Sequence, residues 1–151
     1  MGEETLAERA WRLLGEIGGE RLAVGKLADG LPLPFPVLDD GSEVRAPLAG
    51  LVAGLRAASN EIAVVLPVDT PLVTVELLLE LAGACTDAAV TQTGPLPGAY
   101  ARRVLPVLEA RLARAELELR GALAAIDVAV VESDPAILVN VNTQGDLDRI
   151  L

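Results

Sequence analysis

The segment Ile62 to Val73, which reads IAVVLPVDTPLV, constrains the fold of this chain more than any other segment. Residues 62–66 form an unbroken apolar run, which is typical of a strand covered by helices on both faces of a parallel sheet. Ligands of open α/β sheets bind beyond the carboxyl ends of the strands, so Asp69 stands where a metal and phosphate site would be built. Asp and Pro are also ordinary turn residues, and Asp69 could instead only cap a loop or the next helix.

Helices and strands are expected to alternate along the rest of the chain. Capping residues mark three of the helix starts, namely Thr5 with Glu8, Thr74, and Thr143 with Asp146. The order predicts an α/β fold, a three-layer α/β/α sandwich around a mostly parallel, Rossmann-like sheet. We predict helices at 5–17, 47–58, 74–84, 100–115 (kinked or split by Pro106), 117–125 and from 143 onward, and strands at 21–25, 36–39, 62–66, 88–92, 128–132 and 138–142.

Length, composition and charge argue against a membrane, secreted or nucleic-acid-binding protein. A length of 151 residues fits a single domain, 1–151, and no apolar run is long enough to span a bilayer. The amino-terminal residues lack the pattern of a secretory signal, so a cytoplasmic location is expected and no membrane partner. The net charge of −10 opposes binding to nucleic acid. With one cysteine, Cys85, and no histidine, any metal should be a hard cation bound through oxygen.

Four short motifs follow one another in a fixed order. The first is an acidic pair, Asp39 and Asp40, followed by Ala-Pro-Leu-Ala-Gly at 46–50, and the second is Pro-x-Asp-x-Pro at 67–71. The third is Pro-Leu-Pro-Gly-Ala-Tyr at 95–100, which we expect to open a helix. The fourth is Asn-Val-Asn-Thr-Gln-Gly-Asp-Leu at 140–147. Together they resemble the small nucleotidyltransferases typified by molybdenum cofactor guanylyltransferase. The similarity runs from about residue 5 to the end of the chain.

This resemblance implies a reaction and a set of partners. The reaction is transfer of GMP from GTP to molybdopterin with release of pyrophosphate, and it depends on Mg²⁺. Asp69 would be the catalytic magnesium ligand that connects the metal to the nucleotide. Asp39, or Asp40 one residue on, would be the family's nucleotide-contacting acid. Molybdoenzyme-maturation proteins are further expected partners.

Substrate contacts are implied at two further segments. Pro47, Leu48 and Gly50 lie in the segment that would touch the pterin substrate, although the start of a helix explains them equally well. Asn140 and Asn142 are two residues apart in a predicted strand and would point to the same face, toward a bound phosphate or the waters of the metal. They could also satisfy backbone groups at the end of that strand.

One part of the family pattern is missing. The family begins with a strand and a glycine-rich loop that holds the base and phosphates, whereas Gly18-Gly19 here follows a helix and reads as its carboxyl-terminal signal. Lys26 falls in a predicted strand, so it does not replace the lysine of that loop. We therefore expect this chain to begin inside the family's first helix, with the first strand of the sheet absent. Two alternatives stay open: a nucleotidyltransferase for another cofactor precursor or a sugar phosphate, and an inactive homologue that binds proteins.

Overall fold

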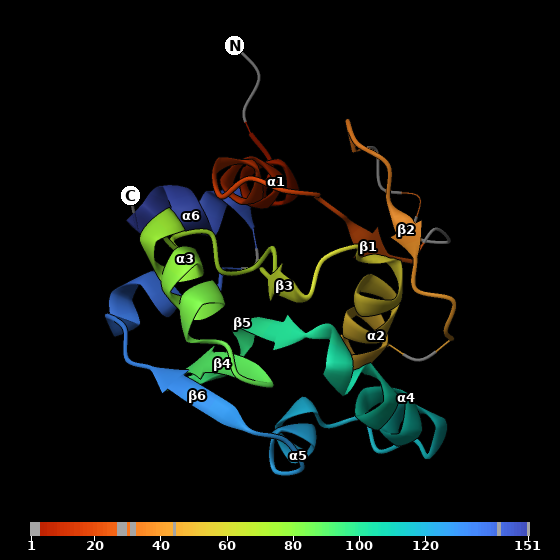
Figure 1. The fold of residues 1–151 in the computed structure, drawn as a ribbon. Helices are drawn as coiled ribbons and strands as arrows, with labels where there is room; N and C mark the ends of the chain where they lie inside the picture. Colours follow the sequence, from red (N-terminus) through yellow and green to blue (C-terminus); the bar gives the residue numbers. More distant parts are fainter. Residues whose placement is uncertain (1–3, 27–29, 31–32, 44, 142, 151) are drawn as a thin grey trace.

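The computed structural model of the chain describes residues 4–26, 30, 33–43, 45–141 and 143–150. Its larger sheet has the strand order β3-β5-β4-β6 (Figure 1). Strands β3 (Ile62–Val65), β4 (Ala88–Thr91) and β6 (Val128–Val131) point the same way, and β5 (Gly94–Ala101) runs antiparallel to β3 and β4. A smaller sheet pairs two further strands in parallel, β1 (Val24–Gly25) and β2 (Leu38–Asp39). The mostly parallel α/β sheet is thus confirmed, with β5 as the reversed strand.

Helices cover both faces of the larger sheet (Figure 1). Alternate residues of the strands point to opposite faces. Ala88 and Tyr100 belong to a core with α2, α4 and α5, and their neighbours Ala89 and Ala99 belong to a core with α3. The three-layer arrangement is confirmed. The helices are α1 (Leu6–Glu16), α2 (Pro47–Ala57), α3 (Val75–Ala84), α4 (Leu105–Ala113), α5 (Leu119–Leu123) and α6 (Gln144–Ile150), with short 3₁₀ helices η2 (Arg102–Val104) and η3 (Pro135–Leu138).

The predicted helix starts are confirmed by their capping hydrogen bonds. The hydroxyl of Thr5 accepts from the Glu8 backbone N–H at 3.1 Å, and the Glu8 carboxylate accepts in return from the Thr5 N–H. Thr74 accepts from Leu77 at 3.2 Å, and Thr143 accepts from Asp146 at 3.1 Å. The carboxylate of Asp146 pairs with Arg149 at 2.9 Å. Local sequence thus determines where these helices begin.

The prediction of a helix over residues 100–115 was wrong at its start. The segment Gly94–Ala101, including the Pro-Leu-Pro-Gly-Ala-Tyr motif, is strand β5. Helices cover both faces of the sheet at β5, so its residues are buried on both sides and the alternation that marks an exposed strand is missing. Pro106 lies in the first turn of α4, where a backbone N–H has no intrahelical partner, so it starts the helix instead of kinking it.

The predicted strand at 138–142 is also wrong. Leu138 ends η3, and the described residues 139–141 belong to no strand; the Val141 N–H donates to the carbonyl of Asp69, in the loop after β3, at 2.6 Å. Leu138 and Val141 are buried, which explains the apolar sequence without a strand. Asn142 lies outside the described residues.

Strand β3 forms as predicted and packs against helices on both faces, with Ala63 and Val65 against the core with α2 and Val64 and Leu66 against the core with α3, but its burial is incomplete. Ile62 is 39% exposed and residues 63–65 are only partly buried. The cause is its position, because β3 pairs with β5 on one edge and has no strand partner among the described residues on the other. None of the helices in the described part of the chain has both the length and the apolar character that a membrane span requires.

Candidate functional site

The candidate site is built on the loop that follows β3, residues 67–71. Its conformation is fixed by short hydrogen bonds within the loop and to a distant segment. The buried Thr70 donates its hydroxyl to the Pro67 carbonyl at 3.2 Å, and the Asp69 carbonyl accepts from Val141 at 2.6 Å. Asp69 therefore lies at the carboxyl end of a parallel strand, next to the segment that contains Asn140.

A basic residue from α1 also holds this loop. Arg9 donates from Nε to the Pro71 carbonyl at 2.7 Å, across 62 residues of sequence. This bond brings a permanent positive charge beside the Asp69 loop, where an anionic ligand would bind. Sequence reasoning missed Arg9, because nothing in its local sequence distinguishes it from Arg12 in the same helix.

The carboxylate of Asp69 is half-buried and accepts no hydrogen bond or ion pair from the described part of the chain. Within the described residues, no group of three or more acidic or cysteine side chains could enclose a metal. The ligand that the described residues offer to a metal at this loop is therefore one carboxylate, that of Asp69. It fits Mg²⁺, which is commonly bound by one or two carboxylates together with waters and the phosphates of a substrate.

The two candidate nucleotide-contacting acids differ in their surroundings. Asp40 is nearly buried, and both of its oxygens accept from Lys26 Nζ, at 3.1 and 2.9 Å. Burial alone would raise the pKa of the Asp40 carboxyl, but the hydrogen bonds from Lys26 and from the Ser42 backbone outweigh it and hold this pKa below its ordinary value. Asp39 is exposed and accepts from the Gly41 N–H at 3.0 Å. Asp39 is thus the acid that a ligand can reach.

The three predicted substrate contacts at the start of α2 differ in their accessibility. Leu48 is fully buried in the core beneath α2, so only Pro47 and Gly50 lie where a substrate can reach them. Both line a cavity of about 470 Å³ that also includes Pro67 and Val68, the residues just before Asp69. The structure therefore brings the start of α2 and the Asp69 loop to the same cavity.

Of the two candidate asparagines, Asn140 and Asn142, the structure describes only Asn140. Asn140 is exposed and next to Val141, the residue bonded to Asp69. The structure does not describe Asn142, so its role stays a prediction. The loop of Asp69 and the segment of Asn140 are joined through their backbones, as the sequence motifs suggest.

Comparison with known proteins identifies related chains. The model of the MobA-like NTP transferase domain matches residues 1–134. A probable molybdenum cofactor guanylyltransferase of Flavobacterium johnsoniae is 31% identical over 128 residues, which cover 78% of this chain and 67% of that protein. A molybdenum cofactor guanylyltransferase of Pseudomonas putida is 44% identical over 92 residues, covering 56% and 48%.

A solved structure supports the same fold. The crystal structure of molybdopterin-guanine dinucleotide biosynthesis protein A from Archaeoglobus fulgidus superposes with a TM-score of 0.62 at 24% identity, over 82% of this chain and 69% of that one. The chain thus spans about half to two thirds of the length of these relatives.

Proposed function

Because the chain belongs to the MobA-like NTP transferase family, a family of nucleotidyltransferases, we propose that it transfers GMP from GTP to molybdopterin. An oxygen of the molybdopterin phosphate attacks the α-phosphorus of GTP. A new phosphorus–oxygen bond forms, the bond from the α-phosphorus to the β-phosphate oxygen breaks, and pyrophosphate leaves. The names of the relatives support guanine as the base and molybdopterin as the acceptor.

The observation that carries this proposal is the open carboxylate of Asp69 on a fixed loop at the carboxyl end of β3. Phosphoryl-group transfer depends on positioning and charge neutralisation more than on a covalent nucleophile. Asp69 holds Mg²⁺, which when bound neutralises charge on the phosphates of the nucleotide. Arg9 fixes the carbonyl of Pro71 and adds positive charge beside the loop.

The remaining residues orient the two substrates. Pro47 and Gly50 face the cavity next to the Asp69 loop and contact the pterin, while Asn140 donates to a phosphate oxygen. Asp39 contacts the nucleotide. Local contacts of this kind are needed because a chain with a net charge of −10 repels nucleotide anions overall. We also propose a cytoplasmic location and molybdoenzyme-maturation proteins as partners.

The proposal is tested by locating the metal and nucleotide on the protein. Mn²⁺ replaces Mg²⁺ in the presence of millimolar GTP, and paramagnetic broadening of the amide NMR signals is measured. We expect broadening at Val68, Thr70 and Val141, which surround Asp69, and its loss in Asp69→Asn. Asp127→Asn is the matched control, because Asp127 is exposed and precedes the parallel strand β6 at the opposite end of the sheet.

Two results would contradict the proposal. Broadening that persists unchanged in Asp69→Asn would remove Asp69 from the metal site. Broadening centred on residues away from the Asp69 loop would move the site elsewhere on the protein.

A further inference from the structure

The loop that carries Asp69, residues 67–71, has few backbone donors with which to hold itself in place. Its two prolines, Pro67 and Pro71, have no N–H and contribute only carbonyl acceptors. Within the loop, the Thr70 hydroxyl donates to the Pro67 carbonyl at 3.2 Å and closes a turn that includes Asp69. The carbonyl of Pro71 lies outside this turn, and its donor comes from another element.

That donor is Arg9 of helix α1, whose Nε lies 2.7 Å from the Pro71 carbonyl oxygen. The other long-range contact of the loop joins two backbone groups, the Val141 N–H and the Asp69 carbonyl. Among the hydrogen bonds that tie the loop to other elements in the described part of the chain, the bond of Arg9 is thus the one that a side chain makes. A substitution can therefore remove it without altering the backbone.

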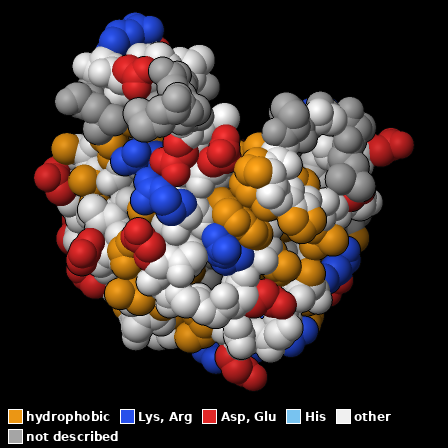
Figure 2. All heavy atoms as spheres, turned by 90° about the horizontal axis from the view of Figure 1, so that it is seen from above, with side chains coloured by type: hydrophobic (Ala, Val, Ile, Leu, Met, Phe, Trp, Pro, Cys, Tyr) orange, Lys and Arg blue, Asp and Glu red, His pale blue; other side chains and the backbone are white. Residues whose placement is uncertain are grey.

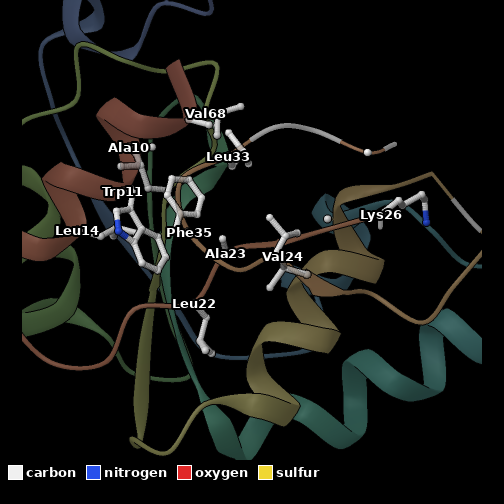
Figure 3. A pocket seen from close by; sticks show the side chains of 15 residues that line it. Ala10, Trp11, Leu14, Leu22, Ala23, Val24, Lys26, Leu33, Phe35 and Val68 are labelled. Carbon is white, nitrogen blue, oxygen red and sulfur yellow. The ribbon is translucent and has the colours of Figure 1, made fainter. Parts of the chain in front are cut away.

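Helix α1 is a firm support for this contact. Ala10, the residue after Arg9, is buried, and Leu14 and Ile17 pack against the core on the α3 side of the sheet. Val68 of the loop borders the same apolar cavity as Ala10 and Leu14 of the helix (Figure 3). The loop and the helix are therefore neighbours, and Arg9 connects them.

The Arg9 side chain is directed by the Pro71 carbonyl and not by an acidic partner. Within the described residues, Arg9 forms no ion pair. The Glu4 carboxylate pairs with Arg12 at 2.8 Å, and the Glu8 carboxylate takes part in the capping box of α1. The hydrogen bond to Pro71 is thus the contact that determines where the guanidinium lies.

The charge of Arg9 explains its placement less well than this hydrogen bond does. On the α1 side of the molecule, Lys and Arg side chains lie among Asp and Glu side chains, so charges of both signs offset one another (Figure 2). A cation beside the site attracts the phosphates of a nucleotide but repels Mg²⁺, and the two effects oppose each other for the metal–nucleotide complex. The position of the loop, in contrast, affects every contact of the bound metal.

We propose that Arg9 is a positioning residue, whose Nε hydrogen bond to Pro71 holds the Asp69 carboxylate where it binds the metal of the metal–nucleotide complex. The inference rests on the proposed function, because it takes Asp69 as the metal ligand. Ligand groups must be held within about 0.5 Å of their productive positions. Loss of a group that orients a metal ligand lowers metal affinity by about 10–100-fold. Because Arg9 acts through the backbone of the loop, the lower end of this range, about tenfold, is expected.

Three substitutions of Arg9 separate the hydrogen bond from the charge. Arg9→Gln places an N–H donor at the same number of bonds from Cα as Nε of arginine, so it keeps the donor and removes the charge. Arg9→Lys keeps the charge but has a carbon atom at that place. Arg9→Met keeps an unbranched side chain and removes both. Arg12→Gln is the matched control, because it removes a positive charge from an exposed position of the same helix.

Metal binding is measured by titrating each variant with Mn²⁺ in millimolar GTP and following the broadening of the amide NMR signals of Val68 and Thr70. We expect the Mn²⁺ concentration at half-maximal broadening to rise by about tenfold in Arg9→Met and Arg9→Lys, and to stay within about threefold of the original value in Arg9→Gln and Arg12→Gln. Urea denaturation of the same variants is followed in parallel. A merely structural role would lower the unfolding midpoint without changing the titration of the folded protein.

The outcomes distinguish this inference from the proposed function. Unchanged Mn²⁺ binding in Arg9→Met, together with loss of broadening in Asp69→Asn, would overturn the inference and leave the proposed function standing. A loss in Arg9→Gln as large as in Arg9→Met would also overturn it, because the donor would then not suffice. Broadening that persists in Asp69→Asn would instead overturn the proposed function. If Arg9→Met does not fold, the comparison of Arg9→Gln with Arg9→Lys decides.

Discussion

The packing of α3 on the sheet predicts that truncating two adjacent leucines destabilises the protein to very different extents. Leu78 is fully buried against the sheet, whereas Leu79 is 52% exposed. Truncating a fully buried leucine removes its transfer free energy and leaves a cavity, which together cost about 2.7–5.0 kcal/mol. Leu78 has 0% exposure in a core of leucines and small strand residues, so we expect Leu78→Ala to lower the free energy of unfolding by about 3–4 kcal/mol. Leu79→Ala, in the same helix, should lower it by about 1 kcal/mol or less.

Urea denaturation followed by far-ultraviolet circular dichroism measures both values. Domains of this size are stable by about 5–15 kcal/mol, so Leu78→Ala should still fold but with an unfolding midpoint at much lower urea. The slope of the unfolding free energy against urea should stay the same in both variants. Equal destabilisation by the two substitutions, or a larger effect at Leu79, would mean that α3 packs on the sheet through another face, and the reasoning from the structure would fail.

Two further predictions concern the acid pair and the activity of the chain. The folded pKa of Asp40 lies below its ordinary value, so the stabilisation from Lys26 is complete above about pH 4 and is lost as pH falls through the folded pKa. In urea titrations from about pH 5 to 2, Asp40→Asn should therefore lose less stability than the original chain; equal losses would show that the pair contributes nothing. The proposed transfer should need a glycine-rich nucleotide loop in addition to residues 1–151: tested alone, these residues should release pyrophosphate from GTP, Mg²⁺ and molybdopterin at a negligible rate, because they contain no such loop to supply charge-assisted hydrogen bonds worth about 1.5–3 kcal/mol each. Adding an upstream Gly-Gly-x-Ser-x-Arg segment should restore release, and robust turnover without it would show the site to be complete.

Elements with local signals could be predicted from the sequence. The capping box of Thr5 and the proline at the first position of α2 each act within one helical turn, so their meaning does not depend on the rest of the fold. The apolar run at Ile62 correctly indicated a strand for the same reason. Its incomplete burial could not be predicted, because burial depends on which strands lie beside it.

Strand β5 shows why other elements could not be predicted. Pro95, Pro97 and Gly98 weaken any strand signal, and the alternation of exposed and buried residues is absent because the strand is covered on both faces. Pairing with β3 and β4 makes this segment a strand, and the pairing with β3 joins residues far apart in the sequence. Tertiary contacts thus override local propensity here.

In the candidate site, too, some features have a local sequence signal and others depend on contacts between distant segments. The strand that ends before Asp69 is a local pattern, so the sequence alone could indicate Asp69 as a candidate. The contacts of Arg9 with Pro71 and of Lys26 with Asp40 join distant segments and had no sequence signal. Because Lys26 occupies both oxygens of Asp40, a nucleotide could reach that carboxylate only by breaking a nearly buried ion pair, which costs several kcal/mol. Asp39 is exposed at the surface, so we propose that Asp39 and not Asp40 is the nucleotide-contacting acid, while the pair of Lys26 and Asp40 stabilises the strand beside it.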